Sequence, residues 1–268
     1  MGGEPDDVDA MIEPVVPSRH RWLAGLLAAS PGDRVLDLGC GTGGSLAQAA
    51  PSVAGGLLAG LDLSAAALGR TAEAVGEAVA GMAEPPGLLC VQADLKASLP
   101  LAGGAFDRVL CHNVLEVLPD PDALVTEAIR VLRPGGRLVL AHSDFDTLIF
   151  ASEDLELTRR LVRDYCDTQQ PWMDAVDGTI GRRLADIAGR AGLVVEDVQA
   201  AVVLGRRFLP GEIGWGYARN LADTLRGDGH ADPAELDRWL AGLQRLDDRG
   251  AFLFSVNDYA VICGRMPR

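Results

Sequence analysis

The chain has 268 residues, enough for one large domain or two small ones, and 48% of them are hydrophobic, which suits a core that needs no disulfide or metal support. Acidic residues outnumber basic residues, 38 to 24, and the formal net charge is −14. This balance argues against nucleic acid and against an anionic membrane surface as partners, because both are bound through clustered basic side chains.

Five cysteines are scattered along the chain without CxxC spacing, so neither a disulfide framework nor a zinc site is predicted. No run of about 18 apolar residues occurs, and the first residues carry no basic-then-apolar leader pattern. We therefore expect a cytoplasmic protein without a membrane span. Residues 1–17, rich in Gly, Pro and Asp, are expected to form a flexible N-terminal arm.

Apolar residues recur at helical spacing over 18–29, and a short apolar strand is expected at 34–38. The next strands, expected at 56–63, 87–93, 106–111 and 137–141, alternate with helices at 45–50, 65–80 and 121–132. This alternation predicts βαβ crossovers and a parallel sheet with helices on both faces. Further helices are expected at 153–166, 179–191, 217–226 and 233–247, with strands at 193–203 and 259–264.

A glycine cluster follows the first strand: residues 37–43 read Asp-Leu-Gly-Cys-Gly-Thr-Gly and lead into a helix. Glycines at these positions permit positive φ and let a ligand approach the backbone closely. The first amides of the following helix favour a carboxylate or phosphate. The spacing differs from the dinucleotide pattern G-x-G-x-x-G, and a tight strand-to-helix turn without a ligand is the structural alternative.

With this motif the sequence resembles the class I S-adenosylmethionine-dependent methyltransferases, particularly their UbiE-like small-molecule branch. The segments 60–64, 92–95, 106–118 and 130–136 resemble further family motifs in the same order, and 143–147 and 250–259 do so less sharply. The resemblance implies a doubly wound α/β fold, a Rossmann-like, mostly parallel seven-stranded sheet whose last strand is antiparallel. It also implies S-adenosyl-L-methionine as cofactor and S-adenosyl-L-homocysteine as product.

The resemblance further assigns roles to single residues. It implies that Asp62 binds both ribose hydroxyls and that Asp94 and Leu95 bind the adenine. It places His112 and Asn113 beside the methionine end of the cofactor. The expected cofactor-binding residues are Asp37, Gly39, Cys40, Gly41, Gly43, Asp62, Leu63, Asp94, Leu95, His112, Asn113 and Arg21.

Several of these residues have a structural alternative. Asp62 could be the N-cap of helix 65–80, Asp94 could cap a turn, and Asp37 could serve the backbone of the glycine loop. Arg19 and Arg21 lie on the helix before the first strand. A solvated surface is the ordinary place for such arginines, and a clamp on the cofactor carboxylate is the other possibility.

The expected methyl acceptor is a small organic molecule, a specialised metabolite, with transfer to oxygen slightly preferred over nitrogen or carbon. His142, at the end of the fifth strand, is the candidate general base, with His20 and His112 as rivals and a purely structural role also open. Residues 18–268 are expected to form one domain, with cap elements at 144–180 and 205–250 shaping the acceptor pocket. From these cap elements Asp144, Trp172 and Trp215 are expected to face the acceptor, although either tryptophan could instead belong to the core.

No metal site is predicted. The fourth strand ends without the carboxylate of the magnesium-dependent catechol type, and Asp144 and Asp146 alone are too few ligands for a hard cation. The alternative function is a protein of this fold that binds the cofactor and catalyses a cyclisation or rearrangement, because fold alone does not fix chemistry. The sequence leaves the oligomeric state open.

Overall fold

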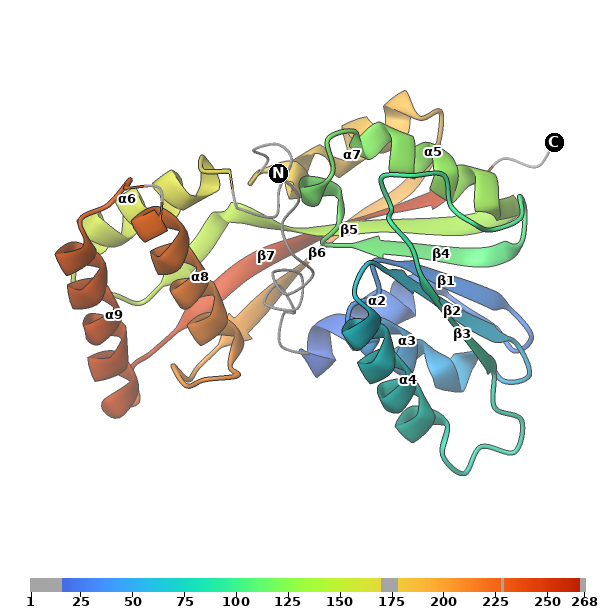
Figure 1. The fold of residues 1–268 in the computed structure, drawn as a ribbon, viewed down its shortest axis with the longest axis horizontal. Helices are drawn as coiled ribbons and strands as arrows, with labels where there is room; N and C mark the ends of the chain where they lie inside the picture. The colour runs from blue at the N-terminus through green and yellow to red at the C-terminus, as the bar shows by residue number, and fades with distance from the viewer. Residues whose placement is uncertain (1–15, 170–177, 228, 266–268) are drawn as a thin grey trace.

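The computed structural model describes residues 16–169, 178–227 and 229–265 (Figure 1). The strands are β1 (Arg34–Leu38), β2 (Leu57–Asp62), β3 (Gly87–Gln92), β4 (Phe106–His112), β5 (Leu132–Phe150), β6 (Val194–Gly205) and β7 (Phe254–Gly264). The helices are α2 (Pro17–Leu27), α3 (Gly44–Ala49), α4 (Ala65–Val79), α5 (Pro121–Val131), α6 (Leu155–Cys166), α7 (Ile180–Arg190), α8 (Ile213–Gly227) and α9 (Pro233–Asp248). Two short 3-10 turns, η1 (Ala50–Ser52) and η2 (Leu115–Val117), complete the elements.

The described strands form one seven-stranded sheet in the order β3-β2-β1-β4-β5-β7-β6. Strands β1 to β5 pair in parallel, whereas β7 pairs antiparallel with both β5 and β6. The order reverses at β1 and β4, and open sheets of this kind bind ligands at the carboxyl ends of the strands beside such a reversal. The predicted fold, a mostly parallel sheet with an antiparallel last strand, is confirmed.

Helices cover both faces of the sheet (Figure 1). On one face α5 and α7 pack on β4, β5 and β7, and their core includes Val125, Leu184 and Ile187. On the other face α2, α3 and α4 pack on the same sheet, with Leu23, Leu27 and Leu46 in their core. Because both faces are covered, β1 and β2 are almost continuously buried and apolar, as parallel strands of this kind are.

A third hydrophobic cluster lies beyond the parallel part of the sheet. There α6, α8 and α9 pack around the far ends of β5 and β7 (Figure 1), with Phe150, Trp239 and Phe254 at the centre. These elements fall within the segments expected to form the cap. Trp239, fully packed in this cluster, is a core residue.

The late strands and one helix are longer than predicted. β5 reaches Phe150 because its antiparallel pairing with β7 continues past residue 141, with a register shift between Asp144 and Ile149. α8 begins at Ile213, ahead of the helix expected at 217–226. Gly214 fits this helix because a Cβ there would lie 2.8 Å from the Cβ of Phe254, so glycine allows α8 to pack on β7. The segment 1–17 expected to form the N-terminal arm overlaps α2 at Pro17, the first residue of that helix, and residues 1–15 lie outside the described ranges.

Candidate active site at the carboxyl ends of the strands

In the glycine loop between β1 and α3, the space where a side chain would stand is open at Gly41. Gly39, Gly41 and Gly43 all have positive φ, at 72°, 52° and 77°. A Cβ at Gly39 would meet Val114 at 2.3 Å, and one at Gly43 would meet Thr71 at 2.8 Å, so these two glycines are required by packing inside the protein. A Cβ at Gly41 would meet nothing within 4 Å. Internal packing therefore does not explain Gly41; its positive φ favours glycine, and its open surroundings leave room for a ligand to approach the backbone.

Asp62, at the end of β2, faces this loop. Its Oδ2 accepts a hydrogen bond from the amide of Gly41 at 2.8 Å, and its Oδ1 accepts from the amide of Ser64 at 3.0 Å. A carboxylate has about four acceptor sites, so roughly two remain for a further donor such as a sugar hydroxyl. The N-cap of α4 is Ser64, whose Oγ accepts from the amide of Ala67, so the N-cap alternative for Asp62 is wrong.

Asp37 is buried in β1 beneath the loop. Burial, and then the neighbouring charge of Asp62, raise its pKa from 3.8 to about 8. Asp62 and Thr71 bond the loop through their side chains, and Oγ1 of Thr71 donates to the carbonyl of Gly41 at 2.8 Å. The backbone amides of Gly39 and Cys40 also donate to the carbonyl of Leu61, at 2.8 and 3.0 Å. Burial, and then Asp37, also raise the pKa of the Cys40 thiol, which is consequently no nucleophile.

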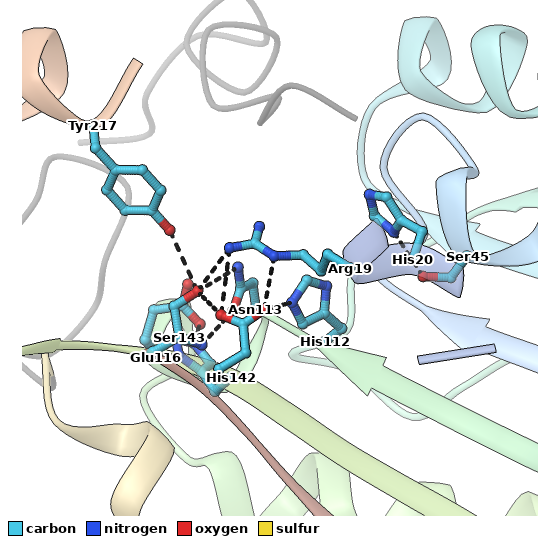
Figure 2. Close-up of polar contacts among 10 residues, drawn as sticks. Arg19, His20, Ser45, His112, Asn113, Glu116, His142, Ser143 and Tyr217 are labelled. Atoms are coloured by element: carbon cyan, nitrogen blue, oxygen red, sulfur yellow. Dashed lines mark hydrogen bonds and ion pairs between the residues drawn. The ribbon is translucent and has the colours of Figure 1, made fainter. Parts of the chain in front are cut away.

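A second polar cluster lies at the carboxyl end of β4 and on the neighbouring middle parts of β5 and β7 (Figure 2). The guanidinium of Arg19, from α2, lies 2.7 Å from Oδ2 of Asp258 and donates to Oγ of Ser143 at 3.3 Å. Oγ of Ser143 in turn donates to Oδ1 of Asp258 at 2.6 Å, and its backbone amide donates to Oδ1 of Asn113 at 2.9 Å. Tyr217, from α8, donates to the same serine hydroxyl at 3.4 Å. The cluster thus connects the parallel part of the sheet with the part of the molecule formed by α6, α8 and α9.

His112 and Asn113 border this cluster. Nε2 of His112 is buried and lies 3.9 Å from Oδ2 of Asp258, and the ring meets that of His20 edge-on at 6.2 Å between centroids. Burial, and then the charges of Arg19 and His20, hold the pKa of His112 well below 6.5, so the ring is neutral at neutral pH. Asn113 has a positive φ of 50°, an uncommon conformation for a residue other than glycine and one that is often found at functional sites.

His142 lies beneath the cluster with no exposed surface. Its Nε2 bonds a carboxylate oxygen of Glu116 and its Nδ1 bonds the carbonyl of Ser143 at 2.6 Å. Burial alone would lower the pKa of this ring, but the charge and hydrogen bond of Glu116 raise it overall. Both ring nitrogens lie against hydrogen-bond acceptors, so each carries a proton. Neither nitrogen then has a free lone pair with which to take a proton from a substrate. This geometry supports the structural role for His142 and gives no support to its role as general base.

The remaining predicted residues are dispersed. Both carboxylate oxygens of the fully buried Asp144 bind Arg182, at 2.6 Å each, so this side chain is engaged inside the protein and does not face an acceptor. Trp215 is half-buried beside Arg219, whose guanidinium lies 5.9 Å from the ring centroid. Trp172 lies outside the described residues.

The residues expected on the adenine side of the cofactor lie apart from these. Oδ1 of the exposed Asp94 accepts from the amide of Lys96 at 2.9 Å, as its turn-cap alternative requires. Leu95 is half-buried and Leu63 half-exposed nearby.

The two candidate arginines of α2 point in different directions. Arg19 is buried in the polar cluster, whereas Arg21 is exposed. Two residues along a helix are about 200° apart, so only one of the pair can face the sheet. Arg19, Leu23 and Leu27, spaced by four, form the buried face of α2. That spacing was a usable signal for Arg19. Asp258 and Glu116 lie in segments that resemble family motifs, but no sequence pattern linked their side chains to Arg19 or His142.

Where the structure describes the chain, no three His, Cys, Asp or Glu side chains gather in a way that could hold a metal ion. In the same residues, no helix combines the length and the apolar character needed to cross a membrane.

Comparison with known proteins identifies the family. Residues 36–140 match the family described as "Methyltransferase domain". The chain is 31% identical over 201 residues to the ubiquinone biosynthesis O-methyltransferase of Thiobacillus denitrificans, a match that covers 73% of this chain and 78% of that one. It is 33% identical over 242 residues to a 37.1 kDa protein in a transposon of Streptomyces fradiae, covering 90% of this chain and 65% of that one.

Two solved structures share the fold. The YcgJ protein of Bacillus subtilis aligns with a TM-score of 0.59 at 19% identity, covering 94% of this chain and 100% of that one. The [4+2]-cyclase SpnF aligns with a TM-score of 0.56 at 17% identity, covering 94% and 81%. Together with the glycine loop and the strand order, the sequence matches show that this chain belongs to the class I S-adenosylmethionine-dependent methyltransferases, enzymes whose cofactor is S-adenosyl-L-methionine.

Proposed function

We propose that this protein transfers the methyl group of S-adenosyl-L-methionine to a hydroxyl oxygen of a small organic acceptor, a specialised metabolite, without a metal ion. The observation that carries the proposal is the loop at the end of β1, whose backbone is open at Gly41 and faces the Asp62 carboxylate. This arrangement suits the cofactor, because its amino-acid tail would lie against the open backbone at Gly41 and its ribose hydroxyls would donate hydrogen bonds to the Asp62 carboxylate. The Thiobacillus relative is named as an O-methyltransferase, which favours oxygen as the methylated atom.

S-adenosyl-L-methionine supplies a reactive methyl group on a sulfonium sulfur. The protein's own contribution begins with position, since holding two reactants in line can be worth about 7–11 kcal/mol at best. In our proposal the loop residues and Asp62 hold the cofactor, with Asp94, Leu95 and Leu63 on its adenine side. The cluster around Ser143 and Asn113 then orients the acceptor.

A hydroxyl acceptor must also lose a proton, and His112 is better suited to take it than His142. The ring of His112 is neutral and borders the cluster, whereas both nitrogens of His142 are occupied. We assign the ring proton of His112 to Nε2, which faces Asp258, so that Nδ1 is the accepting atom. The metal-independent character of the proposal is supported by Asp144 and Asp146, because both carboxylates bind Arg182.

The experiment is incubation of the full chain with methyl-labelled S-adenosyl-L-methionine and a panel of small phenols and hydroxylated aromatic acids. We expect label in the acceptor as a methyl ether, one S-adenosyl-L-homocysteine released per methyl group, and the same rate in excess EDTA. Conversion of an acceptor to an isomer with no S-adenosyl-L-homocysteine released would instead establish the cyclisation or rearrangement alternative. Inhibition by EDTA that magnesium reverses would contradict the metal-independent reaction.

A further inference from the structure

The side chain of Asn113, which follows β4, is held in one orientation (Figure 2). Its Oδ1 accepts from the backbone amide of Ser143 at 2.9 Å, and its own backbone amide donates to the carbonyl of Ala141 at 3.1 Å. A backbone amide can only donate, so the atom of Asn113 that faces it is the oxygen, and the remaining atom is the nitrogen Nδ2. The side-chain group that Asn113 offers to a bound molecule is therefore a donor.

The other groups around Oγ of Ser143 are donors as well (Figure 2). Arg19 approaches this oxygen at 3.3 Å from α2, the hydroxyl of Tyr217 at 3.4 Å from α8, and Nδ2 of Asn113 at 3.5 Å. Oγ gives its own proton to Asp258 at 2.6 Å, so three donors share its lone pairs, each beyond the usual range of about 2.7–3.2 Å. A ligand oxygen at the usual distance would accept stronger hydrogen bonds from these groups than Ser143 does.

The acceptor atoms of the cluster are engaged inside it. Oδ1 of Asp258 accepts from Oγ of Ser143, and its Oδ2 lies 2.7 Å from the guanidinium of Arg19. Within the residues that the structure describes, the acceptor at the border of the cluster is Nδ1 of His112, by the tautomer assigned above. His112 and Asn113 are both partly exposed, so this border is where a ligand reaches the cluster. A ligand there meets one acceptor and several donors.

A hydroxyl group and an amino group make different demands on such a border. A hydroxyl oxygen has one proton and two lone pairs. Its proton meets His112, one lone pair attacks the methyl group, and the other accepts from Asn113. A neutral amino nitrogen has two protons and one lone pair. Its lone pair is used in the attack and one proton meets His112, so the second proton faces a donor.

We propose that Asn113 makes this enzyme select an oxygen acceptor over an amine, with the hydroxyl of Tyr217 as a second donor. The inference rests on the proposed function, because it requires methyl transfer to a molecule bound beside the cofactor. In that transfer the oxygen lone pair forms the new O–C bond, the S–C bond breaks with its electron pair left on sulfur, and the hydroxyl proton passes to Nδ1 of His112. An amine leaves the donor of Asn113 without an acceptor, which weakens binding.

Binding of matched hydroxyl and amino compounds tests the selection. The full chain, loaded with S-adenosyl-L-homocysteine, is titrated in a calorimeter with 4-hydroxybenzoate and 4-aminobenzoate, and with 1-naphthol and 1-naphthylamine. The members of each pair are close in size, and the aromatic amino groups are neutral at neutral pH. We expect the hydroxyl member of at least one pair to bind about tenfold or more tightly than its amine, because one hydrogen bond is replaced by an unmet donor.

Two variants test the residues. Asn113→Asp keeps the oxygen that accepts from Ser143, tolerates the positive φ of 50°, and replaces the donor by an acceptor. It should weaken binding of the hydroxyl member and strengthen binding of the amine, so that the ratio of their dissociation constants changes by about tenfold or more. Tyr217→Phe keeps the ring that stacks on Phe254 at 5.2 Å between centroids, and should reduce the ratio by roughly two- to tenfold.

Tyr165→Phe is the matched control, because Tyr165 is buried in the same group of aromatic rings but its hydroxyl accepts from Asn220 at 2.8 Å. This variant should leave the ratio unchanged, and damage to the fold would weaken both members of a pair alike. Equal binding within both pairs, including no binding by any of the four compounds, or a ratio that Asn113→Asp does not change, would overturn the proposal. Methyl transfer to amines as fast as to their hydroxyl partners would overturn it while leaving a methyltransferase. Failure to methylate any acceptor would overturn the proposed function as well.

Discussion

Replacement of Gly41 by alanine tests whether the open backbone of the glycine loop is a binding surface. The added methyl meets nothing of the protein within 4 Å, so it costs stability only through the positive φ of 52°, roughly 1–2 kcal/mol. If the cofactor's amino-acid tail lies against this backbone, the same methyl occupies its place. Overpacking by one methyl typically costs about 1–3 kcal/mol, which corresponds to a dissociation constant for S-adenosyl-L-homocysteine raised roughly ten- to hundredfold.

Gly250→Ala is the matched control. Gly250 also has a positive φ, of 70°, and open space around its Cβ position, but it lies in the turn between α9 and β7 and not in the glycine loop. Thermal unfolding should show a similar loss of stability in both variants. Calorimetric titration with S-adenosyl-L-homocysteine should show weakened binding for Gly41→Ala alone. Equal affinity in the two variants would refute the assignment of the loop.

Three further variants test the charges around the site. Asp62→Asn should raise the dissociation constant for S-adenosyl-L-homocysteine about tenfold or more in the same titration, because hydrogen bonds to a charged group are worth about 1.5–3 kcal/mol; an unchanged affinity would exclude the ribose contact. Asp37→Asn should stabilise the protein more at pH 8 than at pH 4. Folding raises the Asp37 pKa from 3.8 to about 8, so the wild-type protein loses stability as the pH rises between these values, whereas the asparagine variant does not. Equal effects of the substitution at both pH values in urea unfolding would contradict a protonated Asp37. Glu116→Gln should cost about 3–5 kcal/mol of unfolding free energy near pH 6, because it leaves a buried imidazolium without its partner. Folding raises the pKa of His142, so the stabilisation is present below its unfolded value of about 6.5 and is lost as the pH rises through the folded value. The cost should therefore shrink by pH 9, and a pH-independent cost would count against the charged pair.

The sequence was sufficient for the parallel half of the fold and for the glycine loop. In that half the strands are short, largely apolar runs, and the loop is a contiguous motif, so local pattern carries the information. The sequence was insufficient for β5 beyond residue 141 and for β7 before residue 259. Residues 142–150 show no regular alternation of polar and apolar residues, and both segments are held in the sheet by antiparallel pairing with strands far away in the sequence. No local pattern specifies such a pairing.

The polar cluster was hidden for a related reason. Arg19 and Asp258 are 239 residues apart, and no local sequence pattern indicates that these two side chains form an ion pair. The helical spacing of Arg19 with Leu23 and Leu27 indicated which arginine of α2 faces inward, but the charge that receives it lies on the last strand. The buried state of Asp144 likewise depends on Arg182, a residue of α7 with an ordinary helical context.

A crystal structure of the full chain with S-adenosyl-L-homocysteine would show where the cofactor product binds. We expect the homocysteine tail against the backbone of residues 39–43 and the ribose hydroxyls within hydrogen-bond distance of the Asp62 carboxylate. A nucleoside bound elsewhere, or bound here with Asp62 turned away from the sugar, would contradict this expectation.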